Sequence, residues 1–190
     1  MSDRQNSSIN FLAEARIPRL MKAYSIPCII SLLVAALYNI VDQIFIANAS
    51  YLGSFGNAAN TVVFPLTVVA LALAVMVGDG TCTFVSQSIG RGDEESAEKA
   101  IGNAITASLL IAAVLTALYF VFAEKLLTTF GGRVNEETFR QSSIYFFWIT
   151  SGLPFYIFGQ AMNAIIRADS SPRFAMVSQV SGAILNIILD

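Results

Sequence analysis

Long apolar stretches separated by short polar segments make up most of this chain. Five such runs span residues 26–49, 58–89, 101–123, 143–166 and 172–190. At about 1.5 Å of rise per helical residue, each run can cross the roughly 30 Å of hydrocarbon in a bilayer. The runs lack the two-residue alternation of the shorter strands in a membrane barrel. The pattern therefore predicts an all-α integral membrane protein, a multi-span helical bundle.

The composition agrees with a membrane environment. Hydrophobic residues make up 55% of the chain and charged residues 13%, whereas a soluble domain carries about 25% charged residues. The mean hydropathy is +0.65. We expect residues 1–25 to form an N-terminal arm with the start of the first helix, and residues 26–190 to form the transmembrane bundle. We expect no enzymatic activity, no cofactor and no nucleic-acid partner.

Lysine and arginine are distributed unequally among the polar segments, and this bias sets the orientation of a membrane protein. Eight of them lie in the N-terminal arm and in the two segments that emerge on the same side: Arg4, Arg16, Arg19, Lys22, Arg91, Lys99, Arg167 and Arg173. Three lie on the opposite side: Lys125, Arg133 and Arg140. We therefore expect a multi-pass protein of the plasma (inner) membrane with its N-terminus in the cytoplasm.

The chain offers little for covalent cross-links or metal binding. Cys28 and Cys82 are the only cysteines, both lie in apolar runs, and histidine is absent. A disulfide framework and a histidine-based metal site are therefore not expected. The fifth run still continues when the sequence stops at Asp190, with no polar flank after it. We expect these residues to be part of a longer protein that is truncated in the fifth span.

Three aspartates, Asp42, Asp79 and Asp190, lie within the apolar runs. A charged side chain at the centre of a membrane helix costs about 2.5 to 3.5 kcal/mol, so such residues usually serve a function. Along ideal helices, Asp42 lies about 30 Å from Lys22 and Asp190 lies about 26 Å from Arg173, both measured from the cytoplasmic side. Asp79 lies about 18 Å from Arg91 on that side. We therefore expect Asp42 and Asp190 to share a site and Asp79 to lie lower in the bundle.

Polar residues accompany two of these acids at helical spacing. Tyr38 and Asn39 precede Asp42 by four and three positions, and Asn186 precedes Asp190 by four. Residues so spaced lie on one helical face. A desolvated carboxylate among such groups can take up a proton, or keep its charge and hold a cation. The alternative is a buried acid that neighbouring helices satisfy.

Other positions indicate packing or a cavity. Gly78 and Gly80 flank Asp79, which favours either a local helix break or close packing. Pro154 predicts a kink in the fourth helix, and Gln160 and Asn163 after it either line a cavity or bond to neighbouring helices. Small residues at every fourth position of the third run let another helix approach closely; they are Ala104, Ser108, Ala112 and Thr116.

Several spaced segments resemble one known family. These are LYNIVDQIFIANASYLGSFGNAANTVVFP (37–65), GDGTCTFVSQSIGRGDEESAEKA (78–100), GLPF (152–155) with NAIIRADSSPR (163–173), and NIILD (186–190). In this order they resemble the N-terminal part of multidrug and toxic compound extrusion (MATE) transporters. The resemblance implies twelve helices in two six-helix lobes, with this chain forming most of the N-terminal lobe. It also implies antiport, in which entry of protons or sodium ions drives the export of organic, often cationic, compounds.

The resemblance also implies roles for particular residues. Asp42, with Asn186 and Asp190 of the fifth helix, matches the family's proton- or cation-coupling site, where a sodium ion would bind if sodium is the coupling ion. Tyr145 matches a tyrosine near that site, and Pro27 matches a proline associated with bending of the first helix. Asp79 departs from the family pattern, in which glycine or a small residue is commoner; a supporting role for it stays open. The implied partners are small organic substrates, the bilayer and the remainder of the chain.

Three other functions remain as alternatives. A lipid-linked sugar flippase of the same superfamily would share the fold, but such cavities usually need several basic residues for pyrophosphate, and the interiors of the apolar runs carry acids instead. An intramembrane aspartyl protease shares the GD dipeptide of VGDG (77–80), but Met76 replaces the first glycine of its motif. A channel fits the composition, although no filter-like loop is present.

Overall fold

The computed structural model describes residues 16–48, 53–168 and 171–189, and within these ranges every regular element is a helix. The predicted all-α architecture is confirmed. The elements follow the chain as α2 (Ile17–Asn48), α3 (Gly53–Gly90), α4 (Glu94–Val121), α5 (Ala123–Thr129), the short 3₁₀ helix η1 (Gly132–Val134), α6 (Glu136–Ala168) and α7 (Pro172–Leu189).

The described parts of the first, second, fourth and fifth apolar runs each lie within one helix, whereas the third run (101–123) passes from α4, which ends at Val121, into α5, which begins at Ala123. Three described helices are long and apolar enough to cross a membrane: α2, the Phe55–Gly90 part of α3, and α4. The fourth and fifth runs lie in α6 and α7. That these two helices also cross the membrane stays a prediction.

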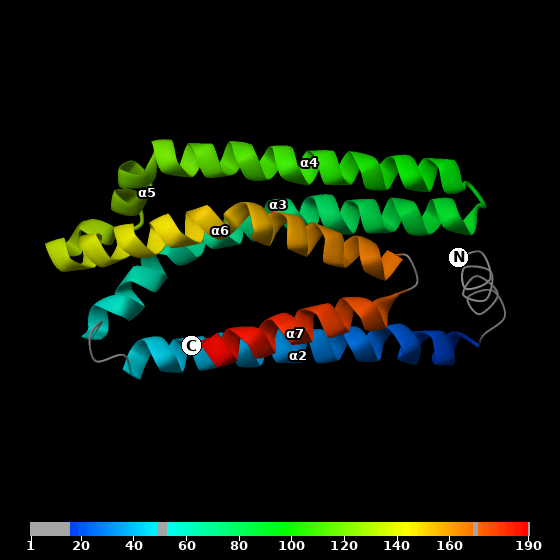
Figure 1. Ribbon diagram of the computed structural model, residues 1–190, viewed down its shortest axis with the longest axis horizontal. Coiled ribbons are helices and arrows are strands. Elements are labelled where there is room, and N and C mark those ends of the chain that lie inside the picture. The colour runs from blue at the N-terminus through cyan, green and yellow to red at the C-terminus, as the bar shows by residue number, and fades with distance from the viewer. Residues whose placement is uncertain (1–15, 49–52, 169–170, 190) are drawn as a thin grey trace.

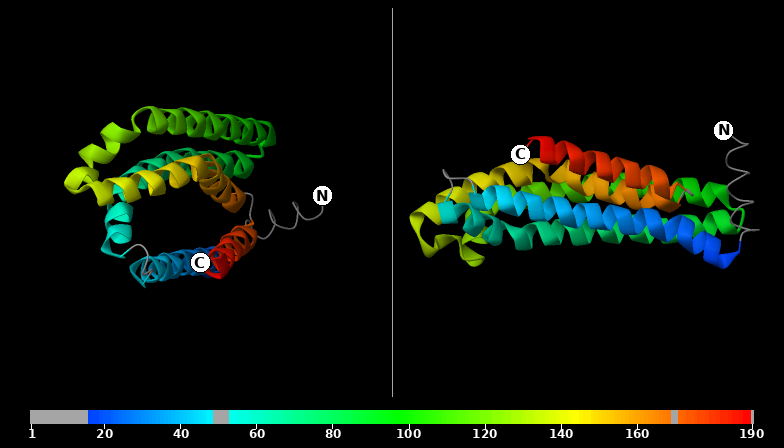
Figure 2. Two further views of the ribbon diagram at one scale, coloured as in Figure 1. Left: turned by 60° about the vertical axis from the view of Figure 1, so that its left-hand side comes forward. Right: turned by 90° about the horizontal axis from the view of Figure 1, so that it is seen from below.

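The helices form two groups, which Figure 1 and the left view of Figure 2 show. In the first group, α3 packs against α6 and α4, and their apolar side chains make the core. In the second, α2 and α7 lie side by side and contact each other more extensively than they contact α3 or α6. The core of the first group consists of Val62, Val63, Leu66, Ala70, Ala74, Ala112, Leu115, Tyr119, Leu127, Phe146, Leu153 and Ile157.

Small residues allow the helices of the first group to approach closely. Ala104, Ser108 and Ala112 of the predicted ladder are buried on α4. On α3, a Cβ added to Gly78 would lie 2.9 Å from the Cα of Ala161 on α6. Around Gly80 the space is open, with nothing within 4 Å of an added Cβ. Of the two interpretations of these glycines, close packing therefore applies at Gly78, and α3 continues through both residues without a break.

Prolines lie inside α2, α3 and α6. A proline within a helix removes a backbone hydrogen bond and bends the axis. In Figure 1, α6 changes direction where its colour passes from yellow to orange, the stretch that contains Pro154, and α3 bends near its beginning, the stretch that contains Pro65. The second bend was not predicted. Pro27 is buried within α2, and its part in bending stays a prediction.

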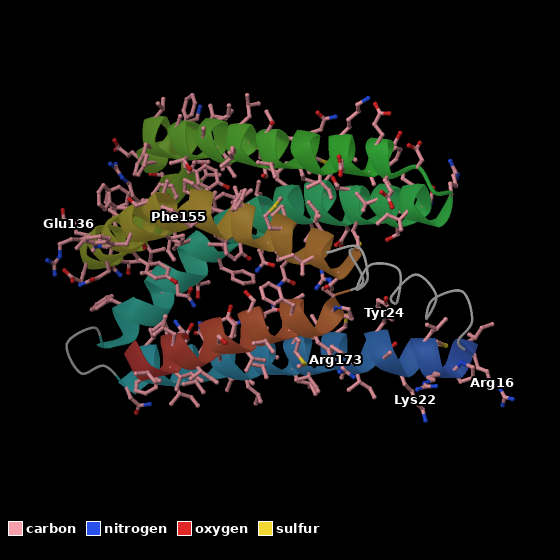
Figure 3. The ribbon with its side chains drawn as sticks, turned by 45° about the vertical axis from the view of Figure 1, so that its right-hand side comes forward. Arg16, Lys22, Tyr24, Glu136, Phe155 and Arg173 are labelled. Atoms are coloured by element: carbon pink, nitrogen blue, oxygen red, sulfur yellow. The ribbon has the colours of Figure 1, made fainter. Side chains whose placement is uncertain are left out.

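The two ends of the molecule differ in their basic residues. The start of α2, the turn between α3 and α4, the end of α6 and the start of α7 lie toward one end, which we call the basic end (Figure 1). Figure 3 shows Arg16 and Lys22 toward this end and Glu136 at the opposite one. At the basic end, Gly92 has a φ of +75°, a conformation that favours glycine, and Asp93 accepts a 3.1 Å hydrogen bond from Ser96 N to cap α4.

Candidate functional site

A cavity of about 500 Å³ lies between α2, α3 and α6, in the part of these helices that is nearer to the opposite end. It brings together residues that are far apart in the sequence. Its lining consists of Tyr38, Asn39, Asp42, Gln43 and Ile46 from α2; Asn60, Phe64, Thr67, Val68 and Leu71 from α3; and Tyr145, Trp148, Ile149, Gly152, Leu153 and Tyr156 from α6. We call this space the central cavity.

Among the described lining residues of the central cavity, the one carboxylate is that of Asp42 on the α2 wall. Tyr38, Asn39 and Asp42 all line the cavity, as the helical spacing predicts. Asp42 is partly buried, and Asn39 Nδ2 donates a 2.8 Å hydrogen bond to the carbonyl of Ala35. The structure therefore brings Asp42 and its two predicted neighbours to one face, open to the same space.

The α3 and α6 walls are joined by a hydrogen bond between side chains. The hydroxyl of Tyr145 donates to Asn60 Oδ1 at 3.2 Å, and Tyr145 also lies within electrostatic range of the Asp42 carboxylate. The resemblance placed Tyr145 near the site. Asn60 was not predicted, although an amide within an apolar run, five positions before Pro65, is a signal that could have identified it.

Aromatic rings form much of the α6 wall. Tyr145, Trp148 and Tyr156 line the cavity from one face of this helix, at spacings of three and eight residues. Aromatic faces attract organic cations. The described lining contains no lysine or arginine. One carboxylate, several amides and several aromatic rings can bind a cation or a neutral aromatic compound, but they offer no charge that would bind an anion.

Of the two fifth-helix residues in the predicted coupling site, the structure describes Asn186 but not Asp190. Asn186 lies on α7, which packs beside α2. Its Oδ1 is buried and accepts no hydrogen bond from the described residues. A buried amide oxygen without a donor destabilises the fold unless a ligand or a water molecule donates a hydrogen bond to it. Asp190 lies outside the described residues, so its predicted proximity to Asp42 stays a prediction.

The other candidate residues lie away from the central cavity. Asp79 does not line it; instead its Oδ1 lies 3.8 Å from Arg167 Nη2 near the basic end. Asn163 Nδ2 donates a 3.1 Å hydrogen bond to the carbonyl of Ala175 on α7, so it bonds to a neighbouring helix. Gln160 is partly buried and is not part of the lining.

Comparison with known proteins places this arrangement among membrane transporters. The family model described as MatE matches residues 27–190. A FAD transporter of Shewanella oneidensis is 28% identical over 94% of this chain and 38% of its own length. The multidrug export protein MepA of Staphylococcus saprophyticus is 24% identical over 100% of this chain and 41% of its own. The chain thus spans about two fifths of the length of these relatives.

A solved structure shares the arrangement of helices. It is a transporter of the MOP superfamily from Pyrococcus furiosus, described as having a binding pocket of reversed polarity that suggests a different function. Its TM-score with this chain is 0.81 at 28% sequence identity, over 89% of this chain and 36% of that one. The similarity supports the helical membrane bundle described above.

Proposed function

This chain belongs to the MatE family of membrane transporters, and we propose that it supplies the N-terminal lobe of an antiporter that exports organic cations. Members of this family are transporters and not enzymes. The observation that carries the proposal is the central cavity, in which Asp42 lies with Tyr38, Asn39 and Tyr145. The missing lobe would come from the remainder of a longer chain.

Asp42 carries the coupling in this proposal. A proton or a sodium ion neutralises its carboxylate, and a cationic substrate competes for the same charge. Entry of the ion and exit of the substrate are then exclusive states of one site. An electrical gradient can drive the exchange, because each charge that crosses the membrane is worth about 2.3 kcal/mol per 100 mV. Asn186 and Asp190 would complete the oxygen ligands if the ion is sodium.

The lining supports a cationic or neutral aromatic substrate rather than a phosphate compound. FAD and the lipid-linked sugars of flippases both carry a pyrophosphate, which calls for lysine or arginine. The described lining offers none. A flavin is nevertheless the second candidate, because the chain is similar to the FAD transporter. In that case the flavin ring would stack on Trp148, and a lobe outside this chain would hold the phosphates.

The orientation follows from the basic end. We propose that this end faces the cytoplasm, with the protein in the plasma membrane, because positive residues accumulate on that side. The central cavity then lies toward the outer half of the bundle, where a substrate would be released.

A transport assay tests the proposal. The full-length protein in liposomes, with a proton or sodium gradient imposed, should accumulate tetraphenylphosphonium, and Asp42→Asn should abolish this gradient-driven uptake. Glu95→Gln is the matched control, because it removes a carboxylate from the exposed Lys99–Glu95 pair outside the cavity. If Asp42→Asn takes up the cation at the parent rate under both gradients, the coupling role of Asp42 is disproved. Uptake of FAD but not of the cation would favour the flavin candidate.

A further inference from the structure

A second polar cluster joins three helices near the basic end. Asp79 Oδ1 on α3 lies 3.8 Å from Arg167 Nη2 on α6. Arg167 Nη1 donates a 3.2 Å hydrogen bond to Asn163 Oδ1, one helical turn earlier. Asn163 Nδ2 in turn donates to the carbonyl of Ala175 on α7 at 3.1 Å. The contacts thus run without interruption from α3 through α6 to α7.

This cluster differs from the surface ion pairs of the chain. Lys99–Glu95 and Arg140–Glu137 each join two residues of a single helix, and Arg133–Glu124 joins η1 to the short helix α5. The Arg167 side chain is 34% exposed and that of Asp79 62%, against 71% for Lys99 and 79% for Glu95. A pair within one exposed helix contributes little beyond that helix, whereas the Asp79 cluster fixes the position of one helix against another.

The cluster connects the two helix groups of the fold. Asp79 lies where α3 and α6 are in close contact, because the neighbouring Gly78 packs directly against Ala161 of α6. At the other end of the cluster, α7 packs chiefly against α2. The cluster therefore ties the α2–α7 pair to the α3–α4–α6 group.

The cluster and the central cavity lie toward opposite ends of the helices. The cavity lies between α2 and the α3–α6 face, in the part of the helices nearer to the opposite end. The cluster lies near the basic end, where its Asn163–Ala175 hydrogen bond crosses between the same two groups and its Asp79–Arg167 contact lies within the α3–α4–α6 group. One end of the boundary between the groups is therefore hollow, and the other is held by polar contacts.

We propose that Asp79, Arg167 and Asn163 form a latch that holds α7 against α3 and α6, and that release of this latch opens the basic end of the boundary between the helix groups. The inference rests on the antiport function proposed above, in which the cavity must become accessible from both sides in turn. A partly exposed ion pair is weak, and a weak contact suits a device that breaks in every cycle. The latch also gives a reason for an aspartate at position 79, where glycine or a small residue is commoner in the family.

Cys82 provides a natural reporter for this movement. It lies three residues after Asp79 on α3, is partly buried, and is within electrostatic range of both Asp79 and Arg167. In the full-length protein with Cys28→Ser, Cys82 becomes the only cysteine of this segment. Its rate of reaction with a small maleimide, followed by mass spectrometry of the peptide that contains it, measures how often the basic end opens.

Four variants test the latch in this background: Asp79→Asn, Arg167→Gln, Asn163→Ala, and the exchanged pair Asp79→Arg with Arg167→Asp. The three single variants should label Cys82 roughly threefold faster or more, as the loss of a weak ion pair or hydrogen bond allows. The exchanged pair should return the rate toward that of the parent. Glu95→Gln should label at the parent rate.

Arg167→Gln separates movement from local electrostatics. A thiolate reacts faster beside a positive charge, so loss of Arg167 would by itself slow the labelling, whereas an open latch speeds it. Labelling no faster than the parent in Arg167→Gln, or no recovery in the exchanged pair, would overturn the proposal. Melting temperatures of all variants are measured in parallel; a rate that rises only with lost stability would also overturn it. None of these measurements requires transport, so a failure of the antiport proposal would be seen separately.

Discussion

The hydroxyl of Tyr145 on α6 donates a hydrogen bond to Asn60 Oδ1 on α3, across 85 positions of the sequence. Both residues line the central cavity. The bond holds the tyrosine ring in one position beside the space into which Asp42 opens. It thus sets the shape of the cavity wall without contributing a charge.

Tyr145→Phe tests this relationship. The variant keeps the ring but leaves Asn60 Oδ1 without its donor, which costs about 0.5 to 1.5 kcal/mol. We expect the affinity for tetraphenylphosphonium, measured by calorimetry on the purified protein, to fall by roughly twofold to tenfold. Tyr24→Phe, on the part of α2 outside the cavity lining, should bind as the parent does. Equal affinity in the parent and in Tyr145→Phe would contradict this account of the wall.

Two glycines on one turn of α3 give a matched pair for packing. Gly78→Ala places a Cβ 2.9 Å from the backbone of Ala161, and overpacking of this kind costs about 1 to 3 kcal/mol. Gly80→Ala meets nothing within 4 Å and gains up to about 1 kcal/mol of helix propensity. Thermal denaturation in detergent should show a lower melting temperature for the first variant and an unchanged or higher one for the second. The same shift in both would show that α3 and α6 are not in close contact here.

The cap of α4 makes a pH-dependent contribution to stability. Hydrogen bonds from Ser96 hold the pKa of Asp93 below its ordinary value. A carboxyl with a lowered pKa stabilises the fold above its unfolded pKa and loses that effect as pH falls through its folded pKa. The melting temperature of the parent should therefore exceed that of Asp93→Ala at neutral pH, and the difference should shrink on acidification below the pKa of this carboxyl. A difference that stays constant between pH 7 and pH 3 would mean that Asp93 does not cap the helix as an anion.

Orientation can be tested with single cysteines. In a background without Cys28 and Cys82, a cysteine at Asn57 should react with a membrane-impermeant maleimide added outside intact cells. A cysteine at Glu94, beside the turn at the basic end, should react only after the cells are opened. The reverse pattern would place the basic end outside the cell and would invert the proposed direction of the cavity.

The sequence was sufficient for the five long helices and for part of the site, but not for α5 and η1. Length and apolarity located all five helical runs, and helical spacing placed Tyr38 and Asn39 on the face of Asp42, because both signals are local. Asn60 was not predicted, because its role in the cavity wall depends on a hydrogen bond from Tyr145, which lies on a helix distant in the sequence. Arg167 was assigned to a polar segment, and only the packing of α3 against α6 shows that it faces Asp79.

The central claim is that a coupling ion and a cationic substrate compete for Asp42. Calorimetric titration of the full-length protein with tetraphenylphosphonium, across pH and across sodium concentration with potassium held as the ionic-strength control, tests it most directly. The account predicts that affinity falls as pH is lowered, by up to about tenfold per pH unit, or falls as sodium rises, and that Asp42→Asn loses this dependence. An affinity that is independent of both ions in the parent, or a dependence that persists in Asp42→Asn, would contradict it.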